Sequence, residues 1–407
     1  MQNMLSRLVA QMIQTGDLTL IFADGKRQKF GDGKGVPLQA EFMDARGPFD
    51  LLRNPELALG ELYTDGRLVM RSGSIYDLLA LVAVCDVRFN PPALISAFRT
   101  ARDAARFLRG PNERAGARAN VAHHYDLDAR LYRLFLDEDQ QYSCAYFQRP
   151  DQTLDEAQTA KKRRIAAKLL LEKDMRVLDI GSGWGGMALY LAQNCGARVD
   201  GATLSLEQFE AAKNRAAEAN LTGQVQFLMR DYRDIEGTYD RIVSVGMFEH
   251  VGAAHFGTFF EKMRALMTRD SVALLHTIGR PDGPGETNPW IRKYIFPGGY
   301  IPSLSEIAAA VEKAGLFITD IEVWRMHYAE TLRHWRERFL ARRAEAAALY
   351  DERFCRMWEF YLALAEIGFR FEGECVFHLQ LTRRHDAAPI TRDYIAAAEA
   401  RLKAAGG

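Results

Sequence analysis

The sequence predicts an α/β fold with a mostly parallel sheet, preceded by a smaller α+β domain. From residue 176 onward, apolar runs typical of strands alternate with runs at helical spacing, the pattern of a parallel sheet wrapped by helices. The first of these strands runs into the glycine-rich turn VLDIGSGWGG (residues 177–186) and then into a helix. The region before residue 95 instead shows a short hairpin among helical segments. The chain's 407 residues are enough for both domains.

The N-terminal domain is predicted to span residues 1–110. Apolar residues at helical spacing indicate a helix before Gly16, and residues 19–22 and 27–30 flank the turn pair Asp24-Gly25 as a hairpin. Further helices are expected near residues 51–59 and 74–84. No catalytic constellation is visible in this domain, and we interpret it as a candidate lipid- or membrane-binding module.

Two basic clusters lie near the domain boundary. Four arginines at intervals of three and four share one helix face, which is either a solvated face or a contact with anionic phospholipid. They are Arg99, Arg102, Arg106 and Arg109. Residues 161–164 (KKRR) point around a helix and are interpreted as surface. Glycine, proline and asparagine between the two clusters predict a linker at residues 111–119.

The second domain is predicted to span residues 120–385. Strands are expected at residues 176–180, 198–203, 225–229, 241–245 and 271–277, and helices at 186–194, 206–220 and 255–266. Alternating apolar residues from Cys375 to Leu381 predict a last, antiparallel strand at the sheet edge. Residues 386–407 are predicted to form a tail with a surface helix and a frayed end.

Composition excludes several classes of protein. Lys+Arg and Asp+Glu both total 53, so the chain has no global basic footprint for nucleic acid. The five cysteines form no C-x-x-C pair, which argues against a disulfide framework or a zinc site and favours a reducing cytoplasm. The N-terminus is not a convincing signal peptide, and no apolar run approaches the roughly 20 residues that span a bilayer. We therefore expect a soluble protein that is at most peripheral to membranes, without a metal.

The glycine-rich turn favours a nucleoside cofactor over a dinucleotide. Its spacing is G-x-G-x-G-G, whereas dinucleotide sites prefer G-x-G-x-x-G with an acidic residue about 20 positions later. This spacing suits a single nucleoside without a pyrophosphate, which makes S-adenosylmethionine (SAM) the preferred ligand. A purely structural role for such a turn remains open at this point.

Four motifs at predicted strand ends carry a resemblance to a known family. They are HHYDL from His123, YSCAYF from Tyr142, GMFEHVG from Gly246 and LLHTIG from Leu274. With the glycine-rich turn they resemble the cyclopropane-fatty-acyl-phospholipid synthases, which include the mycolic acid cyclopropane synthases, over residues 120–384. This resemblance implies a Rossmann-like SAM-dependent methyltransferase domain whose mostly parallel seven-stranded sheet has an antiparallel edge.

The resemblance implies a set of SAM-binding residues. These are Tyr142, Ser143, Gly181, Gly183, Thr203, Leu204, Gln208, Asp231 and Tyr232. Their chemistry suits the ligand, because the turn lets backbone approach the methionine part, Gln208 can reach ribose hydroxyls and Asp231 can accept from the adenine amine. His123, His124 and Tyr125 are expected either near the cofactor or in a lid.

The resemblance also implies a bound bicarbonate held by side chains and one backbone N–H. The expected residues are Cys144, Glu249, His276, Tyr328 and Ile278. Methyl transfer to an alkene leaves a carbocation, and ring closure needs a base that removes a proton from the new methyl group. Taken singly, His276 reads as an ordinary buried histidine and Cys144 as a small hydrophobe.

Aromatic side chains and one long loop are candidates for the substrate side. Tyr146, Phe248 and Tyr294 either offer ring faces to the cation or pack as plain core. Residues 280–304 form an apolar segment bent by several prolines and glycines, which either lines an acyl-chain tunnel or serves as scaffold.

The sequence thus predicts an enzyme that transfers a methylene group from SAM to the cis double bond of an acyl chain in membrane phospholipids, forming a cyclopropane ring. The alternative is a SAM-dependent methylase of the same chains that gives a methyl-branched or methylene product. A lipid-binding protein without catalysis is disfavoured by the intact residue set. We expect a cytoplasmic protein peripherally associated with the inner face of the membrane; the sequence leaves open whether it is a homodimer.

Overall fold

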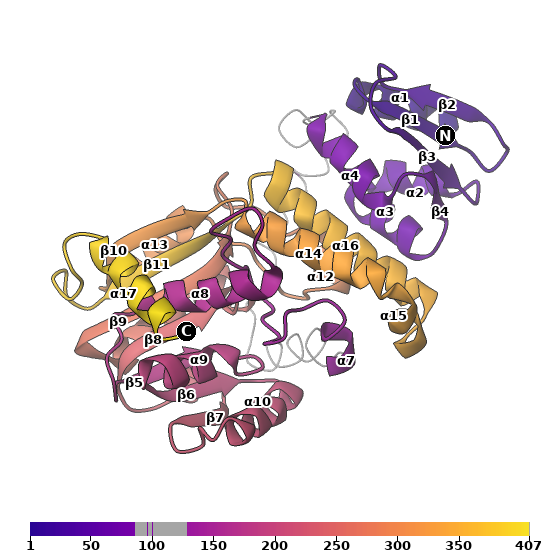
Figure 1. The fold of residues 1–407 in the computed structure, drawn as a ribbon. Coiled ribbons are helices and arrows are strands. Elements are labelled where there is room, and N and C mark those ends of the chain that lie inside the picture. Colours follow the sequence, from indigo (N-terminus) through magenta and orange to yellow (C-terminus); the bar gives the residue numbers. More distant parts are fainter. Residues whose placement is uncertain (86–95, 97–99, 101–127, 407) are drawn as a thin grey trace. The chain divides into compact units, whose positions relative to one another are not determined.

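The computed structural model describes residues 1–85, 96, 100 and 128–406, which form two compact units (Figure 1). The first unit contains the described residues of Met1–Arg109 together with Glu286–Ile295 and Leu332–Gly373. The second contains the described residues of Gly110–Gly285, Phe296–Thr331 and Glu374–Gly407. The arginine face (Arg99, Arg102, Arg106, Arg109), the linker at residues 111–119 and the motif His123, His124, Tyr125 lie outside the described residues.

The first unit combines a small sheet with helices from three parts of the chain. Its strands are β1 (Asp17–Ile21), β2 (Arg27–Phe30), β3 (Pro37–Phe42) and β4 (Leu68–Ser72), in the order β2-β1-β3-β4. Its helices are α1 (Gln2–Met12), α2 (Gly47–Arg53), α3 (Pro55–Thr64), α4 (Ile75–Val84), α12 (Pro289–Tyr294), α15 (Arg343–Leu349), α16 (Glu352–Phe371) and the part of α14 (His327–Ala341) from Leu332 on. Strands β1 and β2 pair antiparallel, which confirms the predicted hairpin.

Late helices complete the core of this first unit. The ring centroid of Phe360 on α16 lies 4.6 Å from that of Trp290 on α12 and 6.1 Å from that of Tyr63 on α3. Arg356 on α16 donates from Nε to the carbonyl of Thr64 over 2.9 Å. The first segment of this unit ends at Arg109, next to the predicted boundary at residue 110, but residues 286–295 and 332–373 of the predicted second domain also belong to the first unit. The sequence does not show this, because an apolar helix face does not say which domain it packs against.

The second unit is a seven-stranded sheet with helices on both faces. Its strands are β5 (Arg176–Ile180), β6 (Arg198–Thr203), β7 (Val225–Met229), β8 (Tyr239–Val245), β9 (Met267–Gly279), β10 (Phe317–Trp324) and β11 (Cys375–Thr382). Its helices are α7 (Ala129–Tyr132), α8 (Leu154–Lys168), α9 (Gly186–Cys195), α10 (Leu206–Glu218), α11 (Phe256–Leu266), α13 (Leu304–Lys313) and α17 (Asp393–Ala404), with short 3-10 turns η2 (Tyr232–Asp234), η3 (Phe248–His250) and η4 (Ala253–His255).

The strand order is β10-β11-β9-β8-β5-β6-β7, and helices cover both faces of the sheet. One apolar cluster joins the sheet to α11 and α13, and another joins it to α8, α9 and α10. Strands β5, β6 and β7 begin and end where the sequence predicted. The sheet is mostly parallel and seven-stranded, as predicted.

The antiparallel strand lies next to the edge of the sheet rather than at it. Strand β11 pairs antiparallel with both β9 and β10, so the edge strand is β10, which the sequence did not predict. Every residue of β11 is buried, as expected for an inner strand. In β10 only Asp320 and Trp324 are buried, and the other residues are partly or fully exposed. The weaker apolar pattern of β10 is the reason that it was missed.

The C-terminal tail belongs to the second unit. Helix α17 packs on α8, and Arg164 on α8 donates from Nη1 to Glu399 on α17 over 2.9 Å. Gln380 on β11 donates to the hydroxyl of Tyr394 over 2.7 Å. Only Ile395 of α17 is buried, so α17 is the predicted surface helix. Among the described helices, none is long and apolar enough to cross a membrane.

Candidate functional site

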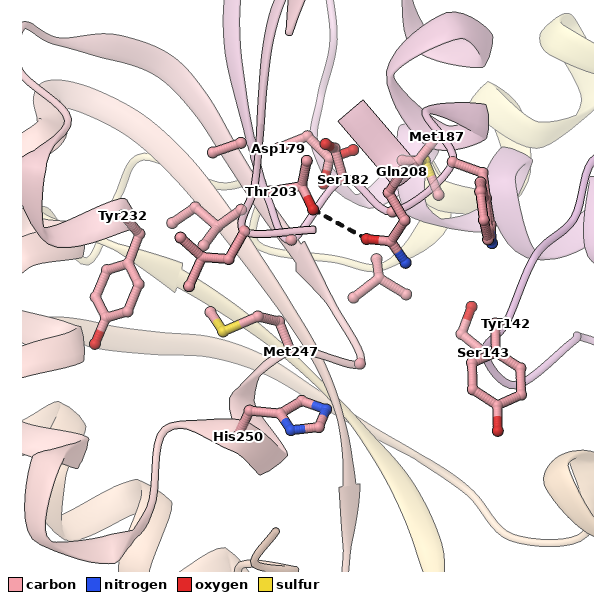
Figure 2. A pocket seen from close by; sticks show the side chains of 18 of the residues that line it. Tyr142, Ser143, Asp179, Ser182, Met187, Thr203, Gln208, Tyr232, Met247 and His250 are labelled. Carbon is pink, nitrogen blue, oxygen red and sulfur yellow. Dashed lines mark hydrogen bonds between the residues drawn. The ribbon is translucent and has the colours of Figure 1, made fainter. Parts of the chain in front are cut away.

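A pocket opens beyond the carboxyl ends of β5 and β6, the position at which open α/β sheets bind ligands (Figure 2). Every residue expected to bind a nucleoside cofactor lines it. They are Tyr142, Ser143, Gly181, Gly183, Thr203, Leu204, Gln208, Asp231 and Tyr232. The space measures about 1220 Å³ with its open mouth included, which is enough for a nucleoside joined to an amino acid.

The glycine-rich turn forms the floor of this pocket. Gly181, Gly183 and Gly185 have φ values of +85°, +54° and +85°, a region that favours glycine. A Cβ added at Gly181 would lie 2.7 Å from Cβ of Met247, whereas one added at Gly183 meets no protein atom within 4 Å. The backbone at Gly183 is therefore open to a ligand.

One side of the pocket is fixed by a hydrogen bond between Thr203 at the end of β6 and Gln208 in the first turn of α10. The Thr203 hydroxyl donates to Oε1 of Gln208 over 2.9 Å, as Figure 2 shows. Ser205 caps α10 by accepting from the backbone N–H of Gln208. Because Oε1 is already an acceptor for Thr203, the amide NH₂ of Gln208 is the part that can donate to a bound ligand.

Asp231 reaches the pocket already paired with a cation. Its carboxylate accepts from Nε and Nη2 of Arg233 over 2.8 and 2.6 Å. The expectation that Asp231 accepts from an adenine amine still fits, since a carboxylate offers about four lone-pair sites. The neighbouring Tyr232 packs edge-on against Phe259 with ring centroids 5.3 Å apart.

Behind the pocket wall lies a lysine that the sequence placed at the surface. Lys161 on α8 is fully buried, which corrects the interpretation of residues 161–164 as surface. Its Nζ donates to Oε1 of Gln141 over 2.7 Å and to Oγ of Ser143 over 2.8 Å, and both acceptor residues line the pocket. Burial lowers the pKa of Lys161 to about 7. The run of four basic residues had suggested a solvated surface, but the two acceptors hold Lys161 in the interior.

Sequence reasoning also missed Asp179 as a pocket residue. This last-but-one residue of β5 lines the pocket and is buried, and its Oδ2 has no hydrogen-bond partner among the described residues. Burial raises its pKa to about 7, and the nearby Lys161 opposes that rise. The sequence did indicate this position, because Asp179 lies two residues before Gly181, where the glycine-rich turn begins.

The residues expected to hold bicarbonate lie outside the lining of this pocket. Glu249 follows β8, and His276 and Ile278 lie near the end of β9. Oε1 of Glu249, on η3 after β8, accepts from the backbone N–H of Ile278 on β9 over 2.6 Å. Oε2 of Glu249 is buried and has no hydrogen-bond partner in the part of the chain that the structure describes. Burial raises the pKa of Glu249 to about 7, and the hydrogen bond from the Ile278 N–H opposes that rise.

The other three expected residues are also buried. His276 lies two residues before Ile278 on β9 and contacts His378 on β11. Cys144 precedes Ala145, whose N–H donates to the hydroxyl of Thr331 over 3.0 Å, one turn after Tyr328 on α14. Burial raises the pKa of the Cys144 thiol well above its ordinary value, so this side chain is a neutral thiol.

The three candidate aromatic residues have different surroundings. Phe248 is buried among Phe256, Phe259 and Phe260, which is core packing. Tyr146 packs on Trp324 with ring centroids 4.7 Å apart.

Tyr294 lies in the first unit, where its hydroxyl donates to Glu61 over 2.8 Å. The loop at residues 280–304 contains α12, whose Trp290 is buried in the first unit. A role for this loop in an acyl-chain tunnel stays a prediction.

Comparison with known proteins gives a consistent assignment. The family model described as mycolic acid cyclopropane synthetase matches residues 112–379. A probable fatty acid methyltransferase of Pseudomonas putida is 38% identical over 313 residues, covering 75% of this chain and 77% of that protein. The cyclopropane-fatty-acyl-phospholipid synthase of Escherichia coli is 44% identical over 247 residues, covering 61% of this chain and 63% of that relative, slightly under two thirds of its length.

A solved structure resembles the chain as well. It is the mycolic acid cyclopropane synthase CmaA1 complexed with SAH and CTAB, with a TM-score of 0.62 and 33% identity. The match covers 65% of this chain and 97% of that one.

Proposed function

The chain belongs to the mycolic acid cyclopropane synthetase family, and we propose that the pocket at the ends of β5 and β6 is the site at which this SAM-dependent methyltransferase binds its cofactor. The enzyme transfers a methylene group from SAM to the double bond of an unsaturated acyl chain, which forms a cyclopropane ring. The observation that carries the assignment of the site is that five chain segments, far apart in the sequence, line one pocket. They are residues 140–143, 179–184, 202–208, 230–233 and 245–251.

The pocket residues fit SAM on their chemistry. The backbone at Gly183 is open, so a ligand can approach it closely. The amide NH₂ of Gln208 can donate to the ligand. Oδ2 of Asp179, which has no partner among the described residues, can accept from an amino group. When bound, SAM supplies a methyl group activated by the positively charged sulfur. Trp184, Met187 and Met247 add apolar surface to the pocket and help to exclude water from the reacting carbon.

Bicarbonate is the proposed base for ring closure. Cys144, Glu249, His276, Tyr328 and the backbone of Ile278 would hold it. The buried Oε2 of Glu249, which lacks a partner among the described residues, can accept from the O–H of bicarbonate. Because the Ile278 N–H now donates to Oε1 of Glu249, bicarbonate would share or replace this bond. The bound anion would then take the proton that the new methyl group loses.

A second product is favoured by one comparison. The relative named as a probable fatty acid methyltransferase covers 75% of this chain, more than the Escherichia coli cyclopropane synthase does. If the substrate cation lost a proton other than one on the new methyl group, or were later reduced, the product would be a methylene or methyl-branched chain. Both products require the same SAM pocket and the same alkene.

The substrate is proposed to be the acyl chain of a membrane phospholipid, reached by a cytoplasmic protein that binds the inner face of the membrane peripherally. The name of the Escherichia coli relative supports the phospholipid. The proposed function is compatible with a homodimer.

Activity on defined vesicles tests the substrate and the base together. Purified protein with radiolabelled SAM should label cis-unsaturated phospholipid vesicles but not saturated ones. Depletion of bicarbonate should slow labelling by at least about tenfold, and added bicarbonate should restore it. Equal labelling of saturated vesicles would overturn the alkene as substrate, and indifference to bicarbonate would overturn the proposed base.

A further inference from the structure

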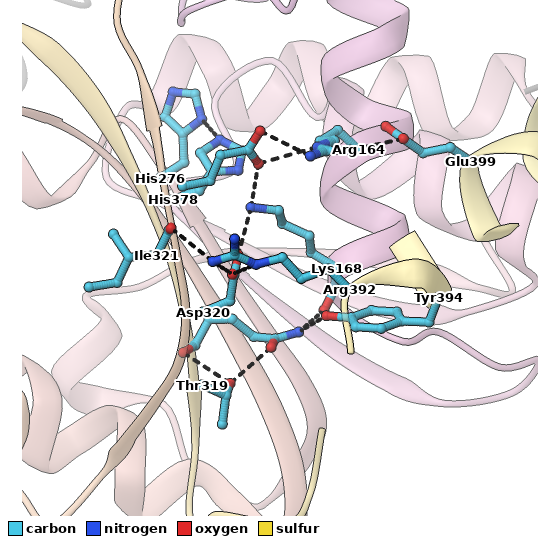
Figure 3. Close-up of polar contacts among 12 residues, drawn as sticks. Arg164, Lys168, His276, Thr319, Asp320, Ile321, His378, Arg392, Tyr394 and Glu399 are labelled. Atoms are coloured by element: carbon cyan, nitrogen blue, oxygen red, sulfur yellow. Dashed lines mark hydrogen bonds and ion pairs between the residues drawn. The ribbon is translucent and has the colours of Figure 1, made fainter. Parts of the chain in front are cut away.

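Two histidines face each other across the inner strands of the sheet. His276 on β9 and His378 on β11 are directly opposite in the antiparallel register. Nδ1 of His276 and Nε2 of His378 are 2.7 Å apart, a hydrogen bond that Figure 3 shows. Both side chains are buried. A 2.7 Å contact between two ring nitrogens requires one N–H and one lone pair, so the two rings have complementary roles.

The surroundings keep both rings neutral. Burial lowers the pKa of each histidine well below its ordinary value, and the cationic side chains of α8 lower both further. Lys161 and Lys168 act on both rings, and Arg164 also acts on His378. Lys168 pairs with Asp320 and Glu322 on β10, and Arg164 pairs with Glu322 and with Glu399 on α17. Asp137 and Asp139 are the acidic groups near Lys161. Figure 3 shows Asp320 and Glu399 around these cations.

The far nitrogen of His378 indicates which ring donates. Nδ1 of His378 is buried and has no hydrogen-bond partner among the described residues, and the ring of Trp324 lies over it with centroids 3.8 Å apart. If His276 donated, the proton of neutral His378 would sit on this Nδ1, as a buried N–H without an acceptor. Either tautomer leaves this nitrogen unpaired, but the positive potential from α8 disfavours a buried N–H there. If His378 donates from Nε2, its Nδ1 is a lone pair, which the same potential favours.

We propose that His378 is a positioning residue that donates from Nε2 to Nδ1 of His276 and thereby fixes His276 as an N–H donor at Nε2. Within the described residues, Nε2 of His276 makes no hydrogen bond of its own. The functional part of this inference rests on the proposed bicarbonate site: a neutral histidine can hold an anion only through an N–H. His276 is then a donor that orients bicarbonate, and it does not itself remove the proton.

The tautomer can be measured without any activity assay. The full chain is labelled with ¹⁵N-histidine, and long-range ¹H–¹⁵N correlations are recorded between about pH 6 and pH 8, the range in which ordinary histidines titrate. Spectra of His276→Gln and His378→Gln assign the two rings. We expect His276 and His378 to be protonated at Nε2 and bare at Nδ1 throughout. A proton on Nδ1 of His276, or a cationic His276 in this range, would overturn the proposal.

A matched pair of variants tests the role in the reaction. The amide NH₂ of glutamine can occupy the position of Nε2 and donate, whereas methionine has similar volume and no donor. His378→Gln should keep the KM for bicarbonate within about threefold. His378→Met should raise it about tenfold or more, by analogy with the loss of partners that orient metal-ligating histidines. The dissociation constant for SAM should change in neither variant.

The outcomes separate this inference from the function it rests on. Equal bicarbonate KM values for the glutamine and methionine variants would mean that His378 only packs. If the wild-type rate ignores bicarbonate, the proposed base is wrong, while the NMR result still decides the tautomer. If the methionine variant fails to fold, the glutamine variant and the wild-type spectra carry the test.

Discussion

Glu249 and Ile278 are joined by a hydrogen bond of 2.6 Å between the buried carboxylate after β8 and the backbone N–H of the neighbouring β9. This bond brings together two residues that we assign to one anion site, at strand ends next to the cofactor pocket. It also leaves the second carboxylate oxygen without a partner among the described residues. The arrangement is more typical of a binding site than of a core, where buried polar atoms are generally paired.

Replacing Glu249 by Gln should slow turnover by at least about tenfold, because the neutral amide is a weaker acceptor for the O–H of bicarbonate. Affinity for SAM should stay nearly unchanged, since Glu249 does not line the cofactor pocket. Calorimetric titration of SAM, together with the initial rate on vesicles, separates the two effects. Equal activity of the variant and the wild type would remove Glu249 from the proposed site.

The pH dependence of stability should report the burial of Glu249. Its folded-state pKa is raised from 4.5 to about 7, so the folded state binds this proton more tightly than the unfolded chain. The unfolding free energy should therefore fall as the pH rises from about 4.5 to about 7, by at most on the order of 3 kcal/mol from this group. Urea unfolding of the wild type and of Glu249→Gln over this range isolates the contribution. Two other carboxyls whose pKa values are raised by burial, Asp137 and Asp179, are present in both proteins. Identical slopes would contradict it.

Lys161 should support the cofactor pocket through Gln141 and Ser143. Lys161→Met removes both hydrogen bonds behind the wall, and we expect the affinity for SAM to fall on the order of tenfold, about 1.4 kcal/mol. Lys168→Met is the matched control: Lys168 is equally buried on the same helix but pairs with Asp320 and Glu322, away from the pocket. The control should lose stability and retain its affinity for SAM. Equal losses of affinity would mean that the pocket depends on α8 as a whole.

Two glycines of the turn should differ in what they tolerate. Gly183→Ala places a Cβ in open space within the pocket, so the fold should survive at a cost of about 1–2 kcal/mol while binding of SAM is lost. Gly185→Ala places its Cβ 2.7 Å from Cζ of Phe227, so it should destabilise the fold by about 1–3 kcal/mol or more. Thermal unfolding and calorimetric titration measure the two effects. If Gly183→Ala bound SAM normally, the cofactor would not approach this backbone.

The sequence predicts this site better than it predicts the division of the chain. Gly181 follows β5, Thr203 ends β6 and Asp231 comes two residues after β7, so their meeting at one sheet edge follows from the topology. Lys161 could not be placed, because a buried lysine and a solvated one look alike in a run of four basic residues. His378 could not be paired with His276, because the register between β9 and β11 depends on a strand that follows long helices. The late helices at residues 332–373 belong to the first unit. Their apolar faces do not show in the sequence which unit they pack against.

The central claim is that this chain builds a cyclopropane ring from SAM at the pocket described here. Purified full-length protein is incubated with SAM, bicarbonate and vesicles of cis-unsaturated phosphatidylglycerol, with Gly183→Ala as the control that cannot bind the cofactor. The acyl chains are then analysed by gas chromatography and mass spectrometry. We predict the gain of one CH₂, loss of the alkene and a saturated three-membered ring, all absent with the control. The same gain with the alkene retained would identify the methylase instead, and no gain in mass would contradict the account.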